Sequence, residues 1–130
     1  MAIQQRYTLV CDDIRVENTG KLFVIGLYTP DVIVEKLPFN IPLLAFLQAY
    51  DVDAPGTLKF RAALQHVDSD SVIAEATGIL DIPASSLMAF AVLKFGNLRF
   101  EKDGRYSFVM KINGQPEPLI HTFNISARQV

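Results

Sequence analysis

The sequence contains one cysteine and no tryptophan, and it has no apolar run long enough to cross a membrane as a helix. With Cys11 alone, no intrachain disulfide is possible, which is typical of proteins from a reducing compartment. A membrane-spanning helix needs about 20 apolar residues, and no stretch approaches that length. The N-terminal segment also lacks the apolar core of ~7–15 residues that a signal peptide needs. We therefore expect a cytoplasmic protein.

Clusters of one charge sign are missing as well. The 12 Lys and Arg residues and the 14 Asp and Glu residues are interspersed and give a net charge of −2. Without a basic block, the sequence offers no surface for nucleic acid and no polybasic segment for a membrane. Half of the residues are hydrophobic. This excess predicts either a dense β-sheet core or an apolar surface that a second copy or another protein covers.

Turn-forming residues recur along the whole chain. The 130 residues suit one domain, and no repeat, low-complexity tract or linker divides residues 1–130. Clusters of Asn, Asp, Gly and Pro follow one another at intervals of about 8–12 residues, a spacing typical of β-sandwiches and barrels. The sequence therefore predicts a single all-β domain of roughly eight strands.

Two segments carry further predictions. Residues 21–29 are apolar on both faces, which predicts a central strand buried on both sides. Residues 85–100 fit either a helix, with Leu87 and Phe90 on one face, or a strand. We favour a short helical turn near 84–90 followed by a strand.

The segment from Gly104 to Ile112 is predicted to be the first strand of a hairpin. Tyr106 and Ile112 lie on one parity of an alternating pattern, together with Phe108 and Met110, which predicts a core-facing side. Asn113 and Gly114 follow, and Asn-Gly is a strong hairpin signal because both residues tolerate positive φ. The residues after Gly114 make the turn longer than two residues.

The run Asp103-Gly104-Arg105-Tyr106-Ser107-Phe108 resembles the Asp-x-Gly/Ala-x-Tyr-x-Cys run of immunoglobulin domains. In those domains the tyrosine hydroxyl bonds back to the preceding turn. Here Phe108 stands in the place of the cysteine, and tryptophan is absent. The resemblance therefore implies an immunoglobulin-like antiparallel β-sandwich rather than an antibody-type domain.

A longer stretch, "VCDDIRVENTGKLFVIGLY" from Val10 to Tyr28, resembles the start of a family of small bacterial proteins without an assigned activity. Their shared pattern is Cys-Asp-Asp-(Ile/Val)-Arg, then Gly-Lys-Leu, an apolar strand and Gly-(Ile/Leu)-Tyr. Leu37-Pro38 and the segment from Gly104 to Phe123 also match. The resemblance implies an immunoglobulin-like sandwich in a bacterial or phage cytosol, without catalysis.

Cys11 is the first candidate for chemistry. A nucleophilic cysteine needs surroundings that favour the thiolate. Asp12 and Asp13 would instead raise the pKa of the thiol. We therefore expect Cys11 to be a small core residue, with Asp12, Asp13 and Arg15 in a strand-end turn.

His66 is the second candidate, because His66, Asp68 and Asp70 follow an i, i+2, i+4 spacing that would place them on one side of a strand. They suit a metal site or, equally, an ordinary hairpin turn. Closed zinc sites usually need more His or Cys residues than this chain offers, and Asp51 with Asp53 is too few ligands for calcium. We expect no metal and no cofactor.

The segment 31–50 is the candidate interface. Pro38 and Pro42 argue against a central strand, so we expect an edge strand or a crossover between sheets. Its aromatic residues either cover the open side of the core or form a surface for a partner. These aromatic residues are Phe39, Phe46 and Tyr50.

The function predicted from the sequence is a non-catalytic, protein-binding or oligomer-forming β-sandwich module. Its partner would be another protein or a second copy, with no nucleic acid and no membrane. The alternative is a small metal-dependent or cysteine-based enzyme that uses His66, Asp68, Asp70 or Cys11.

Overall fold

The computed structural model describes residues 3–29, 31–84 and 88–128, and within these ranges the protein is all β, with nine strands and no helix. The all-β prediction is confirmed, with one strand more than the roughly eight expected. None of the described residues forms a helix that could span a membrane. The strands are β1 (Ile3–Val16), β2 (Leu22–Leu27), β3 (Asp31–Val34), β4 (Phe39–Val52), β5 (Gly56–His66), β6 (Ser71–Ile82), β7 (Met88–Phe100), β8 (Gly104–Ile112) and β9 (Leu119–Ala127).

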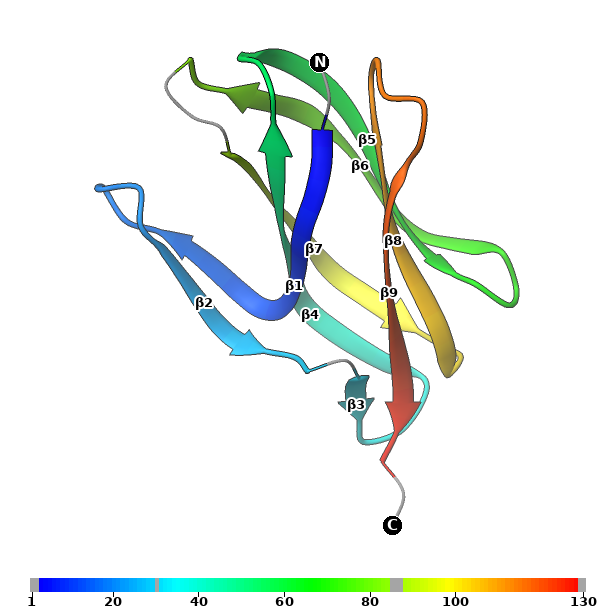
Figure 1. Ribbon diagram of the computed structural model, residues 1–130. Coiled ribbons are helices and arrows are strands. Elements are labelled where there is room, and N and C mark those ends of the chain that lie inside the picture. Colours follow the sequence, from blue (N-terminus) through cyan, green and yellow to red (C-terminus); the bar gives the residue numbers. More distant parts are fainter. Residues whose placement is uncertain (1–2, 30, 85–87, 129–130) are drawn as a thin grey trace.

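The strands form two sheets that face each other as a sandwich (Figure 1). The four-stranded sheet has the order β2-β1-β4-β7, and the five-stranded sheet has the order β3-β9-β8-β5-β6. All described strand pairs are antiparallel except β3 with β9, which run parallel, so the antiparallel prediction is wrong for that pair. The sheets therefore end in four edge strands: β2 and β7 in one, β3 and β6 in the other.

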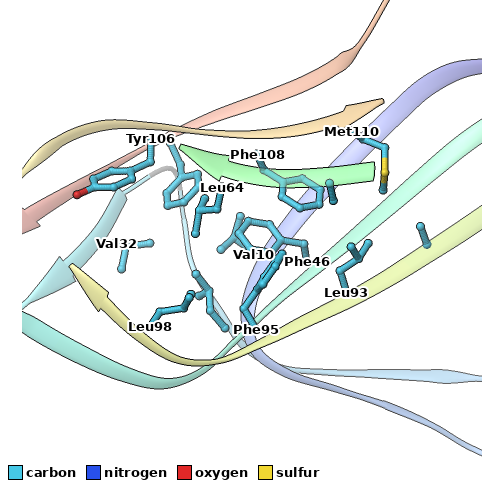
Figure 2. Close-up of a cluster of buried hydrophobic side chains, with 14 of the residues drawn as sticks. Val10, Val32, Phe46, Leu64, Leu93, Phe95, Leu98, Tyr106, Phe108 and Met110 are labelled. Atoms are coloured by element: carbon cyan, nitrogen blue, oxygen red, sulfur yellow. The ribbon is translucent and has the colours of Figure 1, made fainter. Parts of the chain in front are cut away.

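The core lies between the inner faces of the sheets (Figure 2). Successive side chains of a strand point to opposite faces, so β4 directs Leu44, Phe46 and Tyr50 inward. The Phe46 ring stacks on Phe108 of the opposite sheet, with centroids 4.3 Å apart, and meets the edge of Phe95 at 5.8 Å. Aromatic contacts between β4, β7 and β8 thus join the two sheets.

The predicted hairpin of β8 and β9 is confirmed, with residues 113–118 as its loop. The Tyr106 hydroxyl donates to the carbonyl oxygen of Lys102 at 2.5 Å. This bond runs back to the turn before the strand, as the immunoglobulin resemblance implies, and the immunoglobulin-like class itself stays a prediction.

Three other predictions need correction or restriction. The helical alternative is wrong for residues 88–90, because β7 begins at Met88; residues 85–87 lie outside the described ranges. The segment 31–50 contains the edge strand β3 and crosses from one sheet to the other before β4, as expected, but β4 itself is a central strand, contrary to the argument from Pro42. β4 pairs with β1 only over Ala45–Val52. At Pro42, β7 is therefore the only described neighbour of β4. The N–H that Pro42 lacks is not needed for pairing with a strand on the other side.

Residues 21–29 are the clearest correction. They were expected to form a central strand buried on both sides, but β2 is an edge strand. All of its residues except Leu22 are exposed. An apolar pattern on both faces indicates that both faces of a strand are suited to burial. It does not show that other parts of the same chain bury them.

Candidate protein-interaction surface

β2 belongs to a hairpin arm, residues 12–27, that leaves the body of the four-stranded sheet. β1 pairs with β4 only as far as Cys11 opposite Ala45. Beyond that point β1 pairs with β2 alone, with Ile14 opposite Val24. In Figure 1 this blue hairpin extends to the left, away from the five-stranded sheet. The arm is therefore two strands wide.

Gly26 interrupts the regular pairing of β2 with β1. Its φ of +66° is a conformation that side chains rarely adopt, and an added Cβ would meet the Asp12 carboxylate. The Asp12 side chain lies over Gly26 and accepts a 2.7 Å hydrogen bond from the Tyr28 hydroxyl. Burial, and then this bond, raises the pKa of Tyr28 to about 12. Gly26, Asp12 and Tyr28 therefore form one unit that sets the path of β2.

A small apolar cluster and an ion pair hold the base of the arm on the sheet. The cluster contains Cys11, Ile14, Ala45 and Leu47, all buried, with Leu9 and Leu22 packed against it. The ion pair joins Lys94 Nζ on β7 to Asp13 Oδ1 at 2.9 Å, and the hydrogen bond from Lys94 is the largest cause that lowers the pKa of Asp13. The arm thus folds back over the outer face of the four-stranded sheet.

An apolar groove of about 600 Å³ lies between the arm and that outer face. From the sheet, Tyr7 and Phe90 line it with 41% and 47% of their surfaces exposed. The arm contributes Leu22 and Val24. Leu9, Gly20, Leu47 and Val92 complete the lining, which includes no charged side chain.

The other side of β2 is also apolar and exposed. Phe23, Ile25 and Leu27 expose 46%, 45% and 54% of their surfaces. Because alternate residues of a strand face opposite sides, Phe23 and Ile25 point away from the groove that Leu22 and Val24 line. β2 therefore presents apolar side chains on both faces and a free backbone edge.

β2 differs from the other three edge strands in lacking protection. Natural edge strands avoid association by being short, by carrying charges, or by containing proline or bulges. β3 has only four residues, β6 carries Glu75 and Asp81, and β7 carries Lys94 and Arg99. β2 has no charged residue and no proline. It is the edge best suited to accept another strand.

The interface predicted from the sequence is wrong for Phe46 and Tyr50, because both side chains are fully buried in the core. The Tyr50 hydroxyl donates to the buried side chain of Gln48. Phe39 is half-buried and packs against the core at the start of β4. These three residues cover the core, the other alternative that the sequence left open.

The arrangement around His66 is that of a hairpin turn. Its Nδ1 lies 2.6 Å from Ser69 Oγ, and its Nε2 lies 2.9 Å from the carbonyl oxygen of Asp103. Both ring nitrogens are thus engaged within the protein, although a metal ligand needs a free lone pair. Asp68 and Asp70 are exposed in the turn. Within the described ranges no three His, Cys, Asp or Glu residues gather as a metal site would require.

Cys11 lies in the cluster beneath the arm, as a core residue would. It is fully buried, with Sγ 3.7 Å from the carbonyl oxygen of Ala45. Burial, and then the charges of Asp12 and Asp13, raises the pKa of the thiol. A nucleophilic thiolate requires the opposite shift.

The comparisons with known proteins add a family but no activity. The model of one family, described as "Family of unknown function (DUF6941)", matches residues 6–123. A search of the curated proteins found no match for the chain.

Proposed function

The chain belongs to this family of unknown function, and from its surface we propose that the protein is a non-catalytic, oligomer-forming β-sandwich module. A second copy of the chain is the partner, and the arm is the contact surface. The observation that carries the proposal is β2, an uncharged edge strand that exposes apolar side chains on both faces.

The size of the exposed apolar surface supports the proposal that a second copy buries the arm. Monomeric soluble proteins rarely expose large contiguous apolar patches. The exposed fractions of Val16, Phe23, Val24, Ile25 and Leu27 correspond to roughly 400–500 Å² of residue surface, or at most roughly 800–1,000 Å² for two copies, which is at the lower limit for a specific interface. We therefore expect an association that dilution weakens.

The chemistry of the candidate catalytic residues supports a non-catalytic role. The ring nitrogens of His66 are both hydrogen-bonded, and the Cys11 thiol is buried with a raised pKa. The unpaired Cys11 also supports a cytoplasmic location. The bond from Tyr106 to Lys102 supports an immunoglobulin-like sandwich.

Replacing Ile25 with lysine is expected to weaken self-association at least ten-fold, because the apolar contact of Ile25 with the second copy is lost and a lysine on an edge strand disfavours pairing with another strand. Asp13 is the cross-strand neighbour of position 25, so the monomer tolerates the new cation. The measurement is the solution mass by light scattering behind a sizing column, over a dilution series.

Ile79→Lys is the matched control. Ile79 is 62% exposed on β6, an edge strand of the other sheet, so its substitution should leave the mass curve unchanged. A wild-type chain that remains monomeric at every concentration would refute the proposed function.

A further inference from the structure

β2 leaves half of its backbone hydrogen-bonding groups without a strand partner. Among the described strands, β1 is its only neighbour. In an antiparallel ladder, alternate residues direct their N–H and C=O toward the neighbour, and the others direct them away. Glu17 N–H donates to Lys21 C=O, so Phe23 and Ile25, two and four positions after Lys21, also face β1. Tyr28 N–H donates to Val10 C=O, so this alternation changes at Gly26, which has a positive φ and no Cα partner in the ladder. Leu22 and Val24 therefore direct their backbone groups to the free edge.

We infer that two copies join through their β2 strands, which pair antiparallel across a two-fold axis at Val24. This inference rests on the proposed function and states how the association is built. A two-fold axis perpendicular to the sheet makes the pairing of a strand with its own copy antiparallel, and the contact closes after two subunits. The two four-stranded sheets then become one sheet of eight strands.

The absence of charge on β2 favours its own copy as the occupant. Like charges placed opposite each other across two strands are destabilising, and strands such as β6 or β7 would bring carboxylates or cations to their own copies. β2 meets no such repulsion. Its side chains also complement themselves in the register that follows.

The register at Val24 suits both faces of β2. Val24 lies opposite Val24 of the second copy, and Phe23 lies opposite Ile25. Pairs of an aromatic and a β-branched residue are favourable across strands. Leu22 lies opposite Gly26, which has no side chain to crowd it. Gly26 has a positive φ and no Cα partner on β1, so the continuously paired part of β2 is residues 22–25, and the axis at Val24 lies within it.

The same arrangement joins the apolar grooves of the two copies. Leu22 and Val24 line the groove beneath the arm, and Val24 lies on the axis. The two apolar grooves therefore meet at the axis and form one continuous apolar surface across both copies. The association through β2 does not fill this surface.

Cysteine cross-linking tests the register. In a Cys11→Ala background, Val24→Cys places two thiols on neighbouring residues across the axis, about 5.5 Å apart between Cα atoms, within the range that a disulfide spans. We expect a covalent dimer under mild oxidation, formed at least ten-fold faster than with Phe23→Cys, which faces position 25 instead of itself. Val24 and Phe23 have similar exposure, 38% and 46%, so Phe23→Cys is the matched control.

A mixture of the Phe23→Cys and Ile25→Cys chains provides a second, independent measurement. These two chains should cross-link with each other and not with themselves. If the wild-type chain is a dimer but all single variants link equally, or none links, the register is refuted and the proposed function stands. If the wild-type chain is a monomer, the proposed function itself fails.

Discussion

Replacing Phe46 with alanine is expected to lower the free energy of unfolding by about 3–5 kcal/mol, the usual cost of removing a buried phenylalanine side chain. Phe46 is fully buried in β4, and its ring stacks on Phe108 and meets the edge of Phe95. The substitution removes the contacts between the two sheets and leaves a cavity. Denaturation with urea, followed by circular dichroism, measures the loss.

Phe90→Ala is the control for this prediction. Phe90 is 47% exposed in the groove on the outer face of the same sheet, so its removal should cost about 1 kcal/mol or less. Equal costs for the two variants would mean that Phe46 is not a core residue. Such a result would support the interface that was predicted from the sequence.

Replacing Gly26 with alanine is expected to displace the arm. Alanine at a positive φ costs about 1–2 kcal/mol, and its Cβ would meet the Asp12 carboxylate. Asp12 must then move and lose its hydrogen bond from Tyr28, which brings the total to roughly 2–4 kcal/mol. Because Cys11 lies beneath the arm, its thiol should react at least ten-fold faster with a thiol reagent. The rate of Cys11 modification measures the displacement.

Gly20→Ala separates the two causes. Gly20 also has a positive φ, +84°, but nothing lies within 4 Å of an added Cβ. It should show the cost of the backbone conformation without faster modification of Cys11. The same modification rate in both variants would contradict the role of Gly26 in placing the arm.

The sequence predicted the features that depend on neighbouring residues. Alternation along residues 104–112 and the Asn113-Gly114 pair lie within one hairpin, and the predicted hairpin is present. The pairing of β8 with β5 and of β4 with β7 joins residues far apart in the chain. Such pairing is non-local, so local patterns do not contain it. For that reason the sequence left open whether Phe46 and Tyr50 are buried in the core or exposed to a partner.

The candidate surface was missed for a related reason. Residues 21–29 show the pattern of a strand covered on both sides, and the sequence alone assigned that cover to the chain itself. The absence of charge and proline from residues 22–27 favoured the same wrong prediction, because edge strands usually carry one of them. The bend of β1 after Cys11, which exposes β2, depends on packing against Ala45 and Leu47.

Hydrogen exchange of the β2 amides tests the central claim most directly, because it measures whether the free edge becomes paired. At protein concentrations above the midpoint of association, peptides covering residues 21–28 should exchange at least ten-fold more slowly than in dilute solution. Ile25→Lys should abolish this protection. Exchange in β2 that is equally fast at all concentrations, while β4 stays protected, would contradict the account.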